Sequence, residues 1–403
     1  MLHCELKWEI PINMKKAILL ISILSLLLVG CQSEPSSPYT YQPPENISDG
    51  LDVSTLEEVN IDSELMEKLV NDINRDKYDE VHSLLVFRDD KLVFEEYFEG
   101  HKFQWDAPKA HGELVAWDDE MVHFAMSVTK SITSICIGIA IDEGFIESVH
   151  QSIFDYLPEY QHLNTGGRDK ITIEHLVTMR SGLEWDEWGA SPNSADNDIG
   201  ALWFFHSQDP ITAILERPLT DKPGTSFTYS GGNMILLAEI IKNATGMGLD
   251  EFSERYLFQP LGIDSAHWDQ FENGVIDGAG GVHITPRDLA KIGVTFLNQG
   301  VWNEKQIISQ QWVNKSATSF PGNDGINVPG TDERNTGYSY TWWTKSFSDS
   351  GKEINMFYAA GWGGQFIMVT PELNTVIVLT GGNYHDKVRI FNILTNYVIP
   401  ALN

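Results

Sequence analysis

Ser127 and Lys130 stand three residues apart at the start of an apolar segment that extends to Gly144. Apolar residues occur almost all round this segment, which predicts a buried helix. On such a helix the serine hydroxyl and the lysine amine would share one face, within reach of a hydrogen bond. Burial and the positive end of the helix dipole both disfavour an ammonium ion, so we expect a lowered pKa for Lys130. A lysine of this kind could take the proton of Ser127 and make the hydroxyl a nucleophile.

A Ser-x-x-Lys pair alone also fits a serine that caps a helix and a lysine that reaches solvent, because short motifs arise by chance. A second segment supports the chemical interpretation. Residues 223–233 predict a turn-rich loop that leads into an apolar helix over 234–241, with Tyr229 near the bend of the loop. Its phenol could carry a proton between the nucleophile, the base and the leaving group. A tyrosine that only anchors the loop is the alternative.

A third segment combines glycines with the start of a strand. Trp362, Gly363, Gly364 and Gln365 lead directly into the apolar run 366–369. Glycines at this position let a substrate approach the backbone closely, and a free backbone N–H there could face a developing oxyanion. A glycine-rich hairpin with a packed tryptophan is the alternative.

The three segments, in this order, resemble the motifs of the serine β-lactamase and penicillin-binding-protein superfamily. The resemblance is closest to class C-like esterases and to nylon-oligomer (6-aminohexanoate dimer) hydrolases. It extends over residues 63–398, with further similar segments at 171–183 and 280–289.

This resemblance implies a role for each group. Ser127 would form an acyl-enzyme, with Lys130 and Tyr229 sharing the roles of base and acid. The backbone N–H groups of Ser127 and Gln365 would form the oxyanion hole, and water would hydrolyse the ester intermediate.

Two positions depart from the β-lactamase pattern. Gly231 stands where β-lactamases carry the asparagine of Tyr-x-Asn, although Asn233 follows, and Trp362 stands where they carry a lysine. The missing lysine removes a cation that could hold the carboxylate of a penicillin, so we expect a small-molecule ester or uncharged amide as substrate. Trp362 and Trp185 could form apolar walls for an acyl group or could belong to the core. The candidate substrate-binding residues are Trp362, Gly363, Gly364, Gly231, Asn233 and Trp185.

The order of the predicted elements indicates the fold. β-rich runs lie near both ends of the chain, at 83–98 and 338–379, with a mainly helical region at about 122–297 between them. This order predicts an α+β fold of the β-lactamase/transpeptidase type, in which an antiparallel sheet built from N- and C-terminal segments is flanked by helices and carries the helical region as an insertion. A ligand cleft would lie between the two parts, and we expect the loop 184–209 to overhang it.

No pattern predicts a metal or another cofactor, and we expect neither. The chain contains no His-Glu-x-x-His pattern, no cysteine pair at metal-ligand spacing and no calcium-loop pattern. His175, His283 and Arg180 lie in segments predicted as helix or helix cap, so we assign them to structure. The absence of a Gly-x-Ser-x-Gly elbow argues against an α/β-hydrolase fold.

The composition is that of a large acidic globular protein. The 403 residues carry a formal net charge of −30 and a pI near 4.6. This charge would repel phosphate backbones, so nucleic acid is not expected as a partner. A solvated acidic surface is the simplest explanation of the charge, and a cationic substrate is the second. No oligomeric state is predicted.

The N-terminal residues have the layout of an export signal. After Met14 the chain has two lysines, an apolar stretch over 17–29, and Gly30 followed by Cys31. This layout is typical of a secretory signal, and its end resembles the bacterial lipobox, which implies lipidation of Cys31. We expect a lipoprotein signal peptide over 1–30, a tether over 31–50 and the hydrolase domain over 51–403.

Such a protein would be an exported bacterial lipoprotein, anchored to the periplasmic or cell-surface face of a membrane. In a host with two membranes, Gln32 favours the outer membrane by analogy. The sequence as a whole predicts an exported serine hydrolase that cleaves an ester or amide. A D-alanyl-D-alanine carboxypeptidase or β-lactamase is one alternative. A non-catalytic surface binding protein on the same fold is another.

Overall fold

The computed structural model describes residues 38–78, 80–349, 351–385 and 389–402. The chain divides into two units, Met1–Thr40 and Tyr41–Asn403, and the fold below is that of the second. The expected signal peptide over 1–30 and Cys31 lie outside the described residues. In the part of the chain that the structure describes, no helix is both long and apolar enough to cross a membrane.

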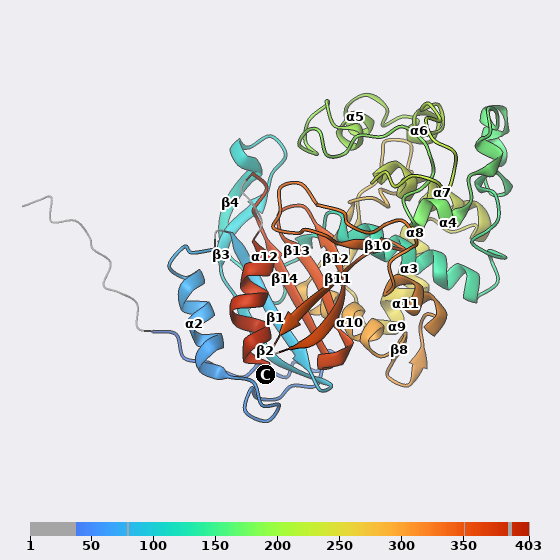
Figure 1. Cartoon of the computed structure of the whole chain (residues 1–403). Coiled ribbons are helices and arrows are strands. Elements are labelled where there is room, and N and C mark those ends of the chain that lie inside the picture. The colour runs from blue at the N-terminus through green and yellow to red at the C-terminus, as the bar shows by residue number, and fades with distance from the viewer. Residues whose placement is uncertain (1–37, 79, 350, 386–388, 403) are drawn as a thin grey trace, which may run out of the picture. The chain divides into compact units, whose positions relative to one another are not determined.

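Seven antiparallel strands form the central sheet, in the order β10-β11-β12-β13-β14-β1-β2 (Figure 1). The N-terminal strands join the C-terminal ones where β1 pairs with β14, with Leu85 opposite Val378. A sheet built from both ends of the chain confirms the predicted α+β class. The strands are β1 (Val81–Arg88), β2 (Lys91–Tyr97), β10 (Gly337–Ser339), β11 (Trp342–Asp349), β12 (Lys352–Gly361), β13 (Gln365–Thr370) and β14 (Thr375–Gly381).

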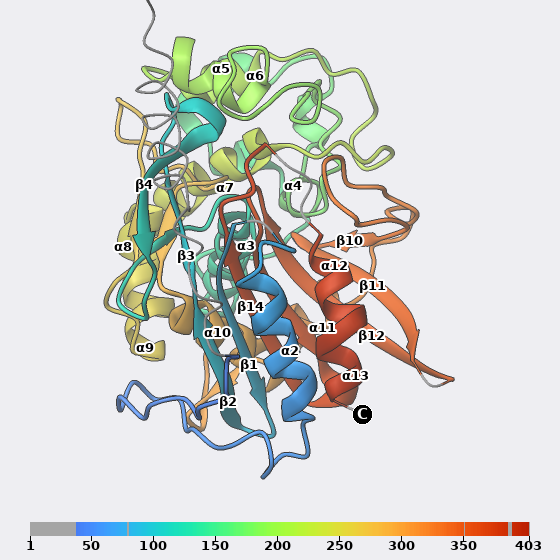
Figure 2. The same cartoon turned by 90° about the vertical axis from the view of Figure 1, so that its left-hand side faces the viewer.

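Helices cover both faces of this sheet. α10 (Pro286–Leu297) packs against β13, β14 and β1 on one face. A Cβ on Gly293 of this helix would lie 2.5 Å from Val376 Cγ1, so the glycine permits the close contact between helix and sheet. α2 (Ser63–Ile73) and the C-terminal helical segments lie side by side on the other face (Figure 2). Those segments are α12 (Ile390–Ile393), η7 (Leu394–Val398) and α13 (Ile399–Ala401).

The inserted region is mainly helical, as predicted, and it also contains a small three-stranded sheet in the order β5-β7-β6. Its α3 (Val128–Asp142) packs against α7 (Gly231–Thr245) and also against β12 and β13. Because α3 contacts both parts of the fold, its first residues lie where the two parts meet. Its other helices and strands are α4 (Ile173–Val177), α5 (Asp198–Phe205), α6 (Pro210–Leu215), α8 (Leu249–Ser253), η5 (Glu254–Phe258), α9 (Gln259–Leu261), β5 (His123–Phe124), β6 (His267–Trp268) and β7 (Val282–Ile284).

The helix α3 is buried from Val128 to Ala140, as its apolar sequence predicts. Two buried hydroxyl groups of this helix donate hydrogen bonds to backbone carbonyls of neighbouring segments. Ser131 Oγ donates to Thr341 O at 2.8 Å, and Thr133 Oγ1 donates to Gly278 O at 2.8 Å. These bonds fix the helix on both sides.

The short remaining elements connect these layers. β3 (Glu99–Phe103) and β4 (His111–Ala116) pair with each other beside the main sheet, joined through η1 (Pro108–Ala110). The others are η2 (Ile153–Asp155), η3 (Pro158–Leu163), η4 (Arg168–Lys170), β8 (Val301–Trp302), β9 (Lys305–Gln306), α11 (Gln310–Ser316) and η6 (Pro371–Leu373).

Candidate active site

Ser127 is the N-cap of α3, and its side chain lies beside that of Lys130. Lys130 Nζ donates a hydrogen bond to Ser127 Oγ at 2.9 Å. The preceding residue, Met126, has a φ of +51°, a left-handed conformation that is uncommon for a side chain of this size. This sharp bend places the serine hydroxyl at the mouth of the buried helix, where the structure brings the predicted nucleophile and lysine together.

Lys130 is 2% exposed and has two further acceptors. Its Nζ donates to Glu187 Oε1 and to the Ala279 carbonyl, each at 3.1 Å. Burial acts to lower the pKa of Lys130, but the Glu187 carboxylate, which also accepts a hydrogen bond from the amine, outweighs it together with the nearby Tyr229 and Asp277 and raises the pKa above its ordinary value. The prediction of a lowered pKa is therefore wrong, because it considered burial and the helix dipole without a buried anion.

That anion, Glu187, is the residue that the sequence interpretation missed. Its side chain is 7% exposed and its second oxygen, Oε2, accepts hydrogen bonds from Trp185 Nε1 at 2.8 Å and from the Gly231 N–H. The sequence shows only one acidic residue among several in a Trp-rich loop, and no spacing singles it out. Glu187 can be identified as the partner of Lys130 only from the fold, which places this loop beside the lysine.

The contact between Glu187 and Gly231 explains the departure from Tyr-x-Asn. A Cβ on Gly231 would lie 2.9 Å from Glu187 Oε2 and 2.9 Å from Ile199 Cδ1, so the carboxylate fills the space that a side chain would need. Asn233 does not replace the missing asparagine. It is fully buried inside α7, where its Nδ2 approaches Met179 Sδ at 3.8 Å.

Tyr229 lies directly before α7, with its ring next to the lysine. Lys130 Nζ is 4.9 Å from the centre of the Tyr229 ring, and Trp343 and Trp188 stack on the same ring with centroid distances of 5.8 and 5.4 Å. Burial raises the pKa of the phenol, and the Lys130 charge only partly offsets this rise. At neutral pH Tyr229 is therefore a proton donor, close to both Ser127 and Lys130.

The glycine motif lies next to the residues before Ser127 through a close backbone contact. A Cβ on Gly361 would lie 2.5 Å from the Ala125 carbonyl oxygen, so the end of β12 touches the residues before Ser127. Gly363 and Gly364 form the turn with φ values of +87° and +105°, which favour glycine. The turn places Gln365 at the start of β13, opposite Gly361.

Two cavities extend from Ser127, and Trp362 and Glu187 line both. The larger has a volume of about 680 Å³ and the smaller about 360 Å³. Of the predicted substrate-binding residues, Trp362 lines both and Gly363 lines the smaller. Four others line neither and are placed beside or behind the site: Trp185, Gly231, Asn233 and Gly364.

The larger cavity has aromatic walls and several carboxylates. The loop 184–209 contributes Trp203 and Phe204 from α5, as expected for a segment that overhangs the cleft. Asp106, Asp269 and Asp277 also line this cavity. Asp277 is buried, which raises its pKa to about 6, and it accepts hydrogen bonds from the backbone N–H groups of Ala279 and Gly280 at 2.9 and 3.2 Å.

The residues assigned to structure make structural contacts. Arg180 donates to the carbonyls of Gly224 and Thr225 and thereby holds the turn that precedes Tyr229. His175 closes the N-terminal capping box of α4 with Thr172. His283 lies in the strand β7 and not in the predicted helix or helix cap, and its Nε2 is 3.1 Å from Asp269 Oδ2.

Comparison with known proteins agrees with this architecture. The family model described as Beta-lactamase matches residues 80–388. The 6-aminohexanoate-dimer hydrolase of Paenarthrobacter ureafaciens is 30% identical over 264 residues, which cover 64% of this chain and 65% of that protein. The matched part is thus less than two thirds of that relative.

Solved structures show the same fold at lower identity. A Bacillus anthracis protein assigned as a 6-aminohexanoate-dimer hydrolase superimposes with a TM-score of 0.65 at 22% identity, covering 90% of this chain and 87% of that one. A family VIII carboxylesterase gives a TM-score of 0.58 at 15% identity, covering 79% and 90%. With the family model matching most of the folded part, these comparisons establish that the chain belongs to the β-lactamase family of hydrolases.

Proposed function

We propose that this protein is a serine hydrolase that cleaves an ester or amide through an acyl-enzyme on Ser127. The observation that carries the proposal is the 2.9 Å hydrogen bond between Lys130 Nζ and Ser127 Oγ, made by a lysine that is 2% exposed. A buried lysine is costly in a protein that only binds a ligand, so the arrangement favours catalysis over the alternative of a surface binding protein.

The proton path follows from the contacts of Lys130. A lysine with a raised pKa must give up a proton before it can act as a base, and Glu187 Oε1, at 3.1 Å, is placed to accept it. The neutral amine then takes the proton of Ser127 as Oγ attacks the substrate carbonyl. Tyr229 protonates the leaving group, and the backbone N–H groups of Ser127 and Gln365 stabilise the oxyanion. Water reverses the sequence and releases the acid.

The two cavities receive different parts of the substrate. Tyr229 lines the smaller cavity and not the larger, so the leaving group that it protonates faces the smaller one. The acyl group then occupies the larger cavity, whose aromatic walls suit an apolar chain. Asp106 and Asp269 lie in the same cavity and favour an acyl chain that ends in an amine. The similarity to a 6-aminohexanoate-dimer hydrolase supports this assignment.

A substrate with a free carboxylate fits less well. Among the described residues that line the two cavities, Lys130 is the only lysine or arginine, and Glu187 already pairs with it. This argues against the β-lactamase and D-alanyl-D-alanine carboxypeptidase alternatives, although a Salmonella agona protein assigned as such a carboxypeptidase is 24% identical over 370 residues.

The location is a separate proposal that depends on the N-terminal sequence. The charged and apolar residues before Gly30-Cys31 support export and lipidation of Cys31, and with it attachment to the outer face of a membrane. Metabolic labelling with an azido fatty acid in the native host tests this. Label should enter the wild type and be absent from the Cys31→Ala variant, and equal labelling of both would contradict lipidation at this residue.

Catalysis is tested by intact-protein mass spectrometry after reaction with a fluorophosphonate. We expect one adduct on the wild type, none on Ser127→Ala and slow labelling of Lys130→Ala. Labelling that persists in Ser127→Ala would exclude this serine as the nucleophile. Substrate preference is tested with three p-nitroanilides: those of hexanoic acid, of 6-aminohexanoic acid, and of adipic acid with its second carboxylate free. We expect turnover to be highest for the amine and lowest for the carboxylate.

A further inference from the structure

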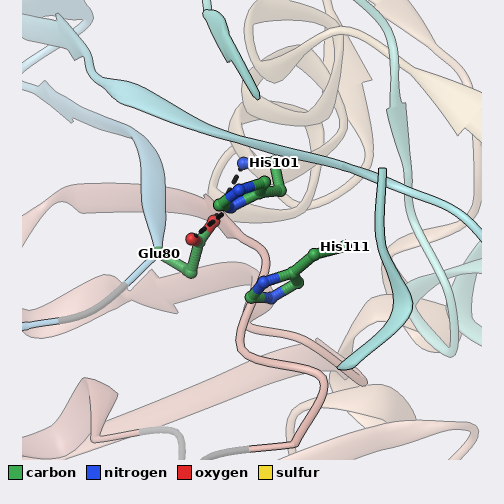
Figure 3. A group of neighbouring side chains, drawn as sticks. All are labelled: Glu80, His101 and His111. Atoms are coloured by element: carbon green, nitrogen blue, oxygen red, sulfur yellow. Dashed lines mark hydrogen bonds and ion pairs between the residues drawn. The ribbon is translucent and has the colours of Figure 1, made fainter. Parts of the chain in front are cut away.

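Glu80, His101 and His111 come together outside the candidate active site (Figure 3). Glu80 precedes β1, His101 lies in β3, and His111 begins β4. One possible ligand atom from each of the three lies within 4.8 Å of the others. Within the described part of the chain this is the one group of three such residues that could hold a metal ion, and its members come from separate segments, so no sequence motif announces it.

Direct contacts hold the group together. Glu80 Oε1 is 2.6 Å from His101 Nδ1, and Glu80 Oε2 accepts the His101 backbone N–H at 2.9 Å. His82 Nε2 lies 3.4 Å from the same Oε2, and it is the outer partner that would orient a ligating carboxylate. His111 Nε2 donates to the Gly382 carbonyl at 2.9 Å, which leaves Nδ1 as the lone-pair nitrogen of the ring.

The backbone around Glu80 is shaped to keep this group in place. Glu80 has a φ of +50°, a conformation that L-residues adopt at a cost. A Cβ on Gly382 would lie 3.0 Å from Glu80 Oε2, and a Cβ on Gly100 would lie 3.2 Å from it. Two glycines therefore leave the space that the carboxylate occupies.

We propose that Glu80, His101 and His111 bind one divalent transition-metal ion of the zinc type. Two imidazoles and one carboxylate are ligands that Zn²⁺ accepts, with a fourth position left for water. His101 is 31% exposed and Glu80 18%, so an ion can reach the group from solvent. The proposal does not depend on the hydrolase activity.

Binding requires a local rearrangement. The His101 and His111 rings are stacked, with centroids 4.5 Å apart and planes within 7° of parallel. A bound ion lies close to the plane of each imidazole that ligates it. At least one ring therefore turns out of the stack, and the proton between His101 and Glu80 leaves as the metal enters.

The site would support the wall of the larger cavity. His101 and His111 lie on the two strands whose connection carries Trp105 and Asp106 into that cavity. Ala110 in this connection belongs to one buried hydrophobic cluster with Met126, the residue before Ser127, and Phe103 at the end of β3 packs against that cluster. A metal that joins β3 to β4 would fix this connection, so occupancy should act on KM more than on kcat.

The test uses untagged protein treated with EDTA and then dialysed. Titration with Zn²⁺ in a calorimeter should show one equivalent bound, and Co²⁺ should give visible absorption bands typical of nitrogen and oxygen ligands. In His101→Ala and His111→Ala the affinity should fall by more than about 100-fold, since even loss of an outer partner costs about 10- to 100-fold. His150→Ala is the matched control, because His150 is also next to a glutamate but is 70% exposed and outside the group.

Two results would overturn the proposal: no binding of Zn²⁺ or Co²⁺ by the wild type, or binding that both histidine variants retain. If the alanine variants fold poorly, His111→Phe keeps a ring in the stack and removes the ligand. It should lose the Co²⁺ bands while keeping the circular dichroism of the wild type. Retained bands in that variant would also contradict the site.

Discussion

Lys130 and Glu187 form a buried ion pair, with Nζ 3.1 Å from Oε1, and 57 residues of sequence separate them. The pair connects α3, the helix with Ser127 at its N-cap, to the loop that covers the cleft. It also sets the charge state of the amine that contacts Ser127. Removal of one partner would leave the other buried and unpaired, which is costly.

Glu187→Gln should lower kcat/KM by at least about tenfold and destabilise the fold by roughly 1–3 kcal/mol, because the ammonium loses a charged acceptor. Without the carboxylate, burial dominates and the pKa of Lys130 falls, so the acid limb of the pH profile of kcat/KM should move to lower pH. Glu184→Gln, in the same loop but exposed, is the control. An unchanged pH profile in Glu187→Gln would contradict the proton path.

Gly231→Ala should act on the same pair without removing a charge. The added methyl group would lie 2.9 Å from Glu187 Oε2 and displace it, at a cost of about 1–3 kcal/mol of stability and most of the activity. In Gly280→Ala the new Cβ would lie 3.7 Å from Asp277 Oδ2, an ordinary van der Waals contact, so stability should change little. Chemical denaturation and fluorophosphonate labelling of both variants provide the comparison. Equal stability and equal labelling of the two variants would mean that Glu187 does not require the absence of a side chain at Gly231.

Phe204 and Phe205 offer a matched pair for the acyl cavity. Both rings are exposed, at 58% and 69%, but only Phe204 lines the larger cavity. Phe204→Ala should raise KM for an apolar acyl anilide about fivefold, which corresponds to roughly 1 kcal/mol of lost contact, with kcat unchanged. Phe205→Ala should leave both constants as they are. Similar effects of the two substitutions would argue that the acyl group lies elsewhere.

Glu333 makes stability depend on pH. It is 1% exposed, and although the Tyr358 hydroxyl hydrogen-bonds to it, burial raises its pKa to about 7. In the folded protein the pKa of Glu333 lies above the ordinary value of 4.5. The contribution of Glu333 to the free energy of unfolding is therefore fully present below about pH 4.5 and is lost as the pH rises through 7. Glu333→Gln should remove this loss, which is of order 3 kcal/mol.

The measurement for Glu333 is urea denaturation at pH 5 and pH 8. The wild type should lose more stability between these values than Glu333→Gln does. Glu353→Gln replaces an exposed glutamate on β12, the strand that carries Tyr358, and should follow the wild type. If the stability of all three proteins depended equally on pH, the pKa of Glu333 would not be raised by burial.

Much of the fold was predictable because it depends on local patterns. The β-rich ends, the helical middle and the buried α3 follow from runs of apolar residues that are continuous in the sequence. That the side chains of Ser127 and Lys130 lie together was predictable for the same reason, since one helical turn separates them.

The rest depends on contacts between distant segments. The charge of Lys130 is set by Glu187, and the placement of Trp185 behind that carboxylate, away from the cavities, follows from the same contact. Asn233 was a candidate because of its nearness to Tyr229 in sequence, but on a helix it turns into the core. Sequence spacing alone does not report which face of such a segment meets the site.

The pairing of β1 with β14 has a consequence for biosynthesis. Val81 is matched with Gly381, so the centre of the sheet cannot form until the ribosome has made the chain as far as β14. Contacts of such long sequence separation slow folding and leave the early hairpin β1–β2 with an open edge during synthesis. A truncation that removes β14 would therefore prevent folding altogether and would not yield a shorter folded protein.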